Sequence, residues 1–259
     1  RLDMMLSNLA MGGILVAVVL TLFLNIQVGF WVLLGIPVSF LGAFWLMPVN
    51  PYPVTVNVLS LFAFIMVLGI VVDDAIVIGE SIYTEAQQQA EKAVSAGDDG
   101  IFRASIEHVI AGAQKVAIPS TIGVLTTMAA FAPMLFIGGV VAGFQEAIAV
   151  VVILCLVFSL IESKLILPAH LVGLKIGAKP KARFQFIGQW QATIDKNLKS
   201  FVVNKYQPFL AYCLKQRYLT VSFFLGLLII AAGAVNSGIA SFEFFPNVPS
   251  DTMRAHIND

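Results

Sequence analysis

Charged residues are scarce in this sequence of 259 residues. Only 12% of the residues are charged and 59% are hydrophobic, whereas an ordinary soluble domain is about 25% charged. So few charges cannot cover the surface of a water-soluble globule, and we therefore expect most of the surface to face lipid. The same composition excludes an intrinsically disordered chain, a nucleic-acid-binding domain and a disulfide scaffold. The equal numbers of basic and acidic residues say nothing about partners.

Cysteine and histidine are also rare. Cys155 and Cys213 are far apart and form no C-x-x-C pair, and the three histidines match no metal-ligand spacing. We therefore expect no disulfide, no nucleophilic cysteine and no metal site. The chain begins with Arg1 rather than Met, and no signal peptide precedes its first apolar run. From this start we expect a fragment of a longer protein.

Long apolar runs dominate the sequence instead. A helix needs about 20 mainly apolar residues to cross roughly 30 Å of hydrocarbon. Six runs qualify, at about 9–26, 30–47, 56–82, 116–137, 140–167 and 219–240. They predict an all-α membrane protein, a bundle of six transmembrane helices. A polar connection is expected from Glu85 to Gly100, and Pro168 is expected to stop the fifth helix.

The stretch 184–215 differs from the six runs. Apolar residues recur there at intervals of three and four with lysines between them, which predicts an amphipathic helix lying on the membrane surface. Ten of the fifteen basic residues lie between Lys164 and Arg217, so the positive-inside rule places this connection in the cytoplasm. The proline-rich loop 48–53 and the turn 138–139 then fall outside, and 241–259 is interpreted as the start of an extracytoplasmic soluble domain.

Two adjacent acids, Asp73 and Asp74, lie well inside the third apolar run. A charged side chain at the centre of a membrane helix costs about 2.5–3.5 kcal/mol on insertion scales, so such acids face a bundle interior or a wet cavity and mark proton pathways. Neighbouring helical residues point about 100° apart, and Glu80 follows Asp73 on the same face. We interpret Asp73 and Asp74 as proton carriers and Glu80 as a candidate accessory group. The alternative is a buried pair that only hydrogen-bonds a neighbouring helix.

Other polar side chains in the apolar runs give weaker signals. Glu162 and Lys164 stand near the inner end of the fifth run, where we expect them to extend to the membrane interface; the alternative is a role in the relay. The hydroxyl groups of the fourth run either line a water path or bond one helix to another. They belong to Ser120, Thr121, Thr126 and Thr127, of which Thr126 and Thr127 are candidate accessory groups of the relay.

Several segments resemble one transporter family. Gly69–Val77, which contains both aspartates, closely resembles the fourth transmembrane helix of resistance–nodulation–division (RND) efflux transporters of the AcrB-like multidrug type. Gly35–Phe44 and Phe131–Gly139 resemble the third and fifth helices, and Phe245–Pro246 resembles the entry into the second porter half. The resemblance implies half of a twelve-helix domain, helices two to seven of the family.

The resemblance also assigns the parts of the chain. Residues 1–183 would carry helices two to six, 184–215 the cytoplasmic-side surface helix, 216–240 helix seven, and 241–259 the truncated start of a periplasmic porter domain. Asp73 and Asp74 would be the proton-relay carboxylates. Because the lysine of the family's relay stands on the tenth helix, the basic partner of the pair is expected outside this chain.

The resemblance further implies a secondary transporter, not an enzyme. It would use the proton-motive force to export drugs or amphiphilic compounds by proton antiport, in the inner membrane of a Gram-negative bacterium. The implied partners are the lipid bilayer, two further copies in a homotrimer, a periplasmic adaptor (membrane fusion protein), an outer-membrane channel and amphiphilic small molecules, with no nucleic acid.

Alternatives remain beside the drug exporter. Metal-exporting relatives carry an acid six residues before the first aspartate and usually a glycine after it; Val67 and Asp74 stand there, which disfavours that branch. A lipid- or translocation-linked member of the superfamily would share the fold. An intramembrane aspartyl protease needs aspartates on two helices, one of them in a Gly-x-Gly-Asp setting. It is disfavoured because Val71 and Val72 precede Asp73, and no other apolar run contains an aspartate.

Overall fold

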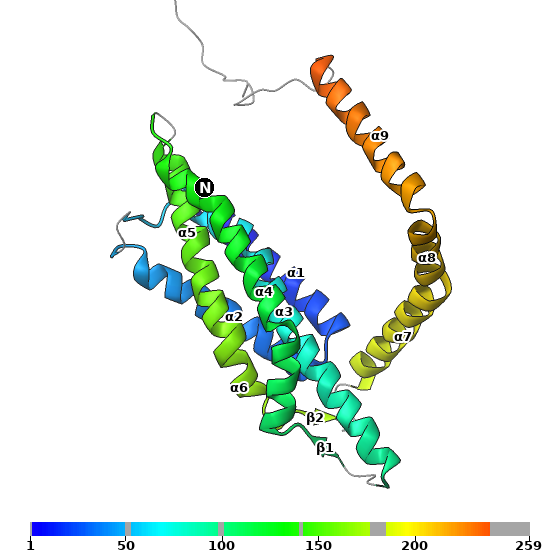
Figure 1. The fold of residues 1–259 in the computed structure, drawn as a ribbon. Coiled ribbons are helices and arrows are strands. Elements are labelled where there is room, and N and C mark those ends of the chain that lie inside the picture. Colours follow the sequence, from blue (N-terminus) through cyan, green and yellow to red (C-terminus); the bar gives the residue numbers. More distant parts are fainter. Residues whose placement is uncertain (1, 50–52, 98–100, 140–141, 177–184, 239–259) are drawn as a thin grey trace, which may run out of the picture. The chain divides into compact units, whose positions relative to one another are not determined.

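The computed structural model describes residues 2–49, 53–97, 101–139, 142–176 and 185–238. It divides into two units, residues 1–195 and 196–259, which are described separately. The main helices of the first unit are α1 (Leu2–Phe23), α2 (Ile26–Leu46), α3 (Val58–Ser95), α4 (Ile106–Phe131), α5 (Ala142–Ile161) and α6 (Leu167–Leu171) (Figure 1).

Short elements connect these helices. The 3-10 turn η1 (Ala132–Phe136) follows α4, and the π-helical turn η2 (Glu162–Ile166) joins α5 to α6. The strands β1 (Phe102–Arg103) and β2 (Lys175–Ile176) form one antiparallel pair. This pair links the segment before α4 to the segment after α6.

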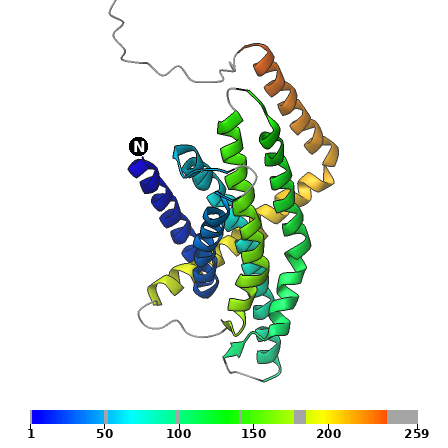
Figure 2. The same ribbon diagram turned by 90° about the vertical axis from the view of Figure 1, so that its left-hand side faces the viewer.

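Helix α3 is the centre of the first unit. It packs against α1, α2, α4 and α5, and α4 and α5 run beside each other (Figure 2). Its buried side repeats every three or four residues, as expected of a helix with one covered face. The helix begins with a capping box, in which the Asn57 side chain accepts hydrogen bonds from the backbone N–H groups of Leu59 and Ser60, at 2.8 and 3.0 Å.

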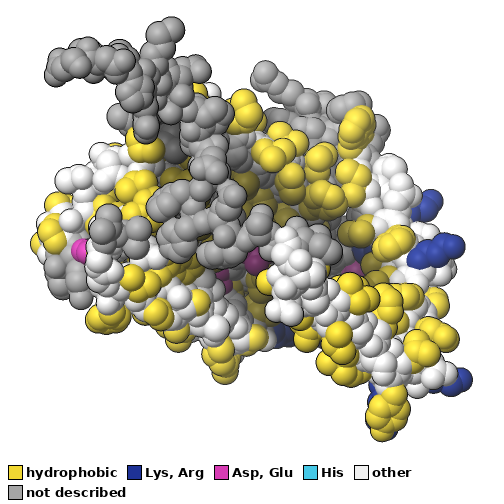
Figure 3. Space-filling model, turned by 90° about the horizontal axis from the view of Figure 1, so that it is seen from above, with side chains coloured by type: hydrophobic (Ala, Val, Ile, Leu, Met, Phe, Trp, Pro, Cys, Tyr) yellow, Lys and Arg dark blue, Asp and Glu magenta, His cyan; other side chains and the backbone are white. Residues whose placement is uncertain are grey.

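The membrane fold predicted from the apolar runs is confirmed. Five helices in the described residues are long and apolar enough to cross a membrane, and a shorter apolar helix, Ser7–Phe23, lies within α1. The five are Ile26–Leu46, Val58–Ser95, Ile106–Phe136, Ala142–Leu171 and Arg217–Asn236. Many large hydrophobic side chains of these helices are exposed, as expected of a surface that faces lipid. Figure 3 shows some of them in yellow, seen from above.

Several predicted helix ends are wrong. The polar connection expected from residue 85 is helical as far as Ser95, and the fourth helix begins at Ile106, ten residues before the predicted start at 116. Pro168 does not stop the fifth helix, because α5 continues through the π-helical turn η2 into α6, in which Pro168 is the second residue. Hydropathy identifies only the part of a helix that suits lipid, and these helices continue beyond it with amphipathic turns.

The second unit is also helical. The amphipathic stretch forms α7 (Gln185–Phe201), the π-helical turn η4 (Val202–Tyr206) and α8 (Gln207–Lys215), and α9 (Arg217–Asn236) follows. Helix α7 begins in the first unit and ends in the second. The position of this stretch on a membrane surface stays a prediction. The expected start of a porter domain, 241–259, lies outside the described residues.

Candidate functional site

The two adjacent aspartates of α3 face different surroundings. The side chain of Asp74 is only 3% exposed, whereas Asp73 is exposed. Glu80 is exposed on the same side of α3 as Asp73, as the helical spacing predicted. Asp73 makes no side-chain hydrogen bond or ion pair with any residue that the structure describes. The pair therefore joins a buried group to an exposed one.

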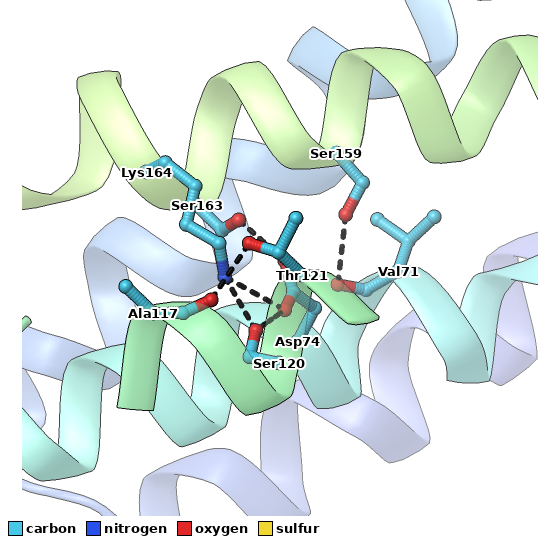
Figure 4. A network of polar contacts seen from close by, with 8 residues as sticks. All are labelled: Val71, Asp74, Ala117, Ser120, Thr121, Ser159, Ser163 and Lys164. Carbon is cyan, nitrogen blue, oxygen red and sulfur yellow. Dashed lines mark hydrogen bonds and ion pairs between the residues drawn. The ribbon is translucent and has the colours of Figure 1, made fainter. Parts of the chain in front are cut away.

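Asp74 is held by three polar side chains from two other elements (Figure 4). The Ser120 hydroxyl of α4 donates to Asp74 Oδ1, and the Ser163 hydroxyl of η2 donates to Oδ2. Lys164 Nζ lies 3.1 Å from Asp74 Oδ1 and also donates to Ser120 Oγ. A carboxylate taken out of water needs such partners, because burial without them costs several kcal/mol.

The π-helical turn η2 positions two of these partners. The N–H of Leu167 donates to the carbonyl oxygen of Glu162, five residues earlier, so the turn is wider than in an α-helix. From this turn the consecutive residues Ser163 and Lys164 both reach Asp74. One turn earlier, the Ser159 hydroxyl donates to the Val71 carbonyl at 3.4 Å, which also joins α5 to α3.

The expectation that Glu162 and Lys164 extend to the membrane interface is wrong. Glu162 is 2% exposed and the Lys164 side chain 18% exposed. Lys164 stays inside because Asp74 compensates its charge. Glu162 fits inside because Gly35 of α2 faces it without a side chain, and a Cβ at Gly35 would collide with the Glu162 carboxylate. The rule that long charged side chains extend to the interface considers each side chain alone, without partners on neighbouring helices.

A basic partner of Asp74 also lies within the chain. Lys164 pairs with Asp74, whereas the sequence led us to expect a basic partner only outside the chain, and that further partner stays a prediction. The spacing between the two residues gives no hint of this pair, because they stand on different helices. The sequence signal that could have indicated the pair was the polar group Glu162–Lys164 at the end of an otherwise apolar run.

The hydroxyl groups predicted for the fourth run have separate roles. Only Ser120 reaches Asp74, while the Thr121 hydroxyl donates to the Ala117 carbonyl of its own helix at 2.7 Å. Thr126 and Thr127 donate to backbone carbonyls one turn earlier, at 2.7 and 3.1 Å. The structure does not join Thr126 or Thr127 to the Asp74 network, and their accessory role stays a prediction, as does that of Glu80.

A second polar contact fixes α4 against α3. The Ser81 hydroxyl donates to the Gly112 carbonyl at 2.7 Å. Further along, Lys115 Nζ lies 2.5 Å from Glu85 Oε2, and Gln89 donates to the other Glu85 oxygen at 2.7 Å. Sequence reasoning missed these contacts. They set the register of the two helices, and with it the position of Ser120 opposite Asp74.

Comparison with known proteins identifies the family. The model of the AcrB/AcrD/AcrF family matches residues 2–258. The chain belongs to this family. No group of three or more His, Cys, Asp or Glu side chains that could hold a metal ion is found in the described part of this family member.

Similar proteins in this family are named for different processes. The toluene efflux pump membrane transporter TtgE of Pseudomonas putida is 26% identical over 204 residues, 77% of this chain and 18% of the relative. The cobalt-zinc-cadmium resistance protein CzcA of Cupriavidus metallidurans is 28% identical over 246 residues, 93% of this chain and 21% of the relative. The swarming motility protein SwrC of Bacillus subtilis is 26% identical over 257 residues, 97% of this chain and 22% of the relative.

The chain spans about a fifth of the length of the curated relatives it matches. It is therefore part of the membrane domain of an RND-type transporter, a multi-pass membrane protein, and transporters of this family are not enzymes. The expected family membership is confirmed. The comparisons give toluene and metal exporters alike, so they do not select the cargo.

Proposed function

We propose that this chain is the proton-translocating membrane part of a pump that uses the proton-motive force to export drugs or amphiphilic compounds by proton antiport. The observation behind the proposal is the Asp73–Asp74 pair. It places two carboxyl groups in an apolar helix, one buried among Ser120, Ser163 and Lys164 and the other exposed. Acids inside a membrane span mark proton relays because an unused charge there is costly.

The surroundings of Asp74 suggest how a proton would change the protein. Ionised Asp74 accepts hydrogen bonds from Ser120 and Ser163 and attracts Lys164. A proton on Asp74 removes the negative charge and one acceptor site, so the ties from α3 to α4 and to η2 weaken together. Each charge that crosses the membrane potential supplies about 2.3 kcal/mol per 100 mV. The relay would use this energy to change helix packing.

The proposal also covers the oligomeric state, location and partners of the intact pump. We expect the intact protein to be a homotrimer in the inner membrane of a Gram-negative bacterium, with a periplasmic adaptor and an outer-membrane channel as partners. No cofactor is needed, because the proton gradient supplies the energy. Amphiphilic small molecules would be the cargo.

Metal export is the second candidate function. The similarity to CzcA over 93% of the chain favours it. The sequence around the relay opposes it, because Val67 and Asp74 stand where the metal-exporting pattern has an acid and a glycine. We therefore propose amphiphile export first and keep metal ions as an outcome of the test.

The test uses the intact transporter in a bacterial strain that lacks its own drug pumps. We expect wild-type protein to lower ethidium accumulation, and Asp73→Asn or Asp74→Asn to return accumulation to the level of cells without the transporter. Glu91→Gln is the matched control, since Glu91 is an exposed acid of the same helix, and it should export ethidium normally. Equal amounts of each protein in the membrane must accompany the comparison.

Two results would contradict the proposal. Normal ethidium export by Asp73→Asn or Asp74→Asn would show that the substituted aspartate is not needed as a proton carrier. Wild-type protein that raises tolerance to zinc, cobalt and cadmium, but not to ethidium or bile salts, would replace amphiphile export with metal export.

A further inference from the structure

We infer that Lys164 is a positioning residue of the relay, the counter-charge that holds ionised Asp74 in place from the same half of the transporter. The inference rests on the proposed function, in which Asp74 binds and releases a proton. It adds a basic group on the π-helical turn η2 to a relay for which the sequence supplied none.

The contacts of Lys164 join three elements. Its ammonium group lies 3.1 Å from Asp74 Oδ1 on α3 and also donates to the Ser120 hydroxyl on α4, while its own backbone belongs to η2. Ser163, the preceding residue, donates to the second oxygen of the same carboxylate. Both carboxylate oxygens are therefore held by partners from η2, and one of these partners also holds α4.

Burial makes the pair electrically strong. The two side chains are 18% and 3% exposed, and an ion pair shielded from water interacts more strongly than one on the surface. The lysine ammonium group is a compact point charge on a flexible stem, which lets it reach Asp74 and Ser120 together. An ammonium group at this depth would be unfavourable without the carboxylate beside it.

Among the described residues, Lys164 is the cation that pairs with Asp74, and the other charged groups nearby are acids. Glu162 of η2 is a second buried acid that interacts electrostatically with Asp74, and Asp73 is its neighbour on α3. Helix α2 contains no charged residue, α5 carries only Glu146 in its first turns, and α4 faces Asp74 with the neutral Ser120. Two buried acids and one lysine form a cluster that is neutral when one carboxyl group is protonated.

This arrangement gives Lys164 a definite effect on the relay. The lysine favours ionised Asp74, because an opposite charge stabilises the charged form of an acid. When Asp74 takes up a proton, Lys164 loses its attraction to α3 and keeps its contact with Ser120. Proton binding at one carboxyl group thereby alters the contacts of η2 and α4 in a single step.

Infrared difference spectroscopy on the purified full-length transporter in lipid nanodiscs tests this effect. The carboxylic acid band that titrates in wild-type protein and is missing in Asp74→Asn reports protonation of Asp74. In Lys164→Met we expect this band to persist to higher pH than in wild-type protein, because the opposite charge that favours the ionised carboxylate has been removed. Lys164→Arg keeps the charge and should stay close to the wild-type midpoint.

Lys115→Met is the matched control. Lys115 also pairs with an acid of α3, Glu85, but belongs to the contact that sets helix register, so its loss should leave the Asp74 midpoint unchanged. Lys164→Gln, which keeps the length and a hydrogen-bond donor, is measured beside Lys164→Met. If Lys164→Met does not reach the membrane, Lys164→Gln gives the same test.

The outcomes separate this inference from the proposed function. An unchanged Asp74 midpoint in Lys164→Met and Lys164→Gln, or an equal shift in Lys115→Met, would overturn the positioning role even if Asp74→Asn abolishes ethidium export. Normal export by Asp74→Asn would instead refute the relay itself. An upward shift confined to the Lys164 variants, restored by Lys164→Arg, supports Lys164 as the counter-charge.

Discussion

Gly112 lets α4 approach α3 closely enough for the two backbones to touch. A Cβ at this position would lie 2.6 Å from Ile82 Cα and 3.0 Å from the Ser81 carbonyl oxygen. Backbone atoms cannot turn away as a flexible side chain can, so any side chain here forces the helices apart. Because Ser120 stands on the same helix, such a separation would also withdraw its hydroxyl from Asp74.

We therefore predict that Gly112→Ala destabilises the transporter and reduces export. The expected loss is about 1–3 kcal/mol, typical of overpacking, measured as a lower melting temperature of the purified protein. Gly123→Ala is the control, since a Cβ there meets nothing within 4 Å. Both changes raise helix propensity equally, so the difference between them reports the contact. Equal melting temperatures would show that the close approach contributes nothing.

Single residues also show what the sequence could predict of the site. The different surroundings of Asp73 and Asp74 follow from the turn of about 100° per helical residue, and the acids themselves are evident from their apolar setting. The places of Glu162 and Lys164 could not be derived in the same way. They depend on Gly35 of α2 and Asp74 of α3, and a rule for isolated side chains does not include residues on neighbouring helices.

Among the elements, the helices were easier to predict than their ends. Each apolar run contains a helix because lipid requires every backbone group to be bonded within the segment. The extension of α3 to Ser95 depends instead on amphipathic turns, with Ala86 and Ala90 buried and Glu91 exposed. The π-helical turn η2 is not evident from the spacing of apolar residues. It ends two residues before Pro168, as η4 ends two residues before Pro208.

The capping box of α3 offers a test at this level. Asn57→Ala removes the oxygen that accepts hydrogen bonds from the N–H groups of Leu59 and Ser60, and we expect a loss of about 1 kcal/mol in stability. Asn57→Asp keeps an acceptor at the same place and should melt close to wild type. A melting temperature that falls equally in both variants would indicate a cause other than the cap.

The whole chain carries its charges in a pattern that predicts its direction in the membrane. Most basic residues lie between Lys164 and Arg217, while the loop 48–53 and the turn 138–139 contain none. Basic loops remain in the cytoplasm. Helix α3 is a single crossing between the loop after α2 and its own end at Ser95, so these two points should lie on opposite sides of the membrane.

Cysteine labelling of the full-length transporter tests this direction. All cysteines of the full-length transporter, Cys155 and Cys213 among them, are first replaced by alanine, and ethidium export confirms that this background works. Val49→Cys and Ser95→Cys are then introduced at exposed positions. A maleimide that cannot cross membranes should label Val49→Cys in cells with a permeabilised outer membrane, and Ser95→Cys only after the inner membrane is opened. The reverse pattern would invert the orientation and assign the basic stretch to the outside. Labelling of both positions in cells with an intact inner membrane would contradict α3 as a crossing helix, and with it the placement of Asp73 and Asp74 inside the bilayer.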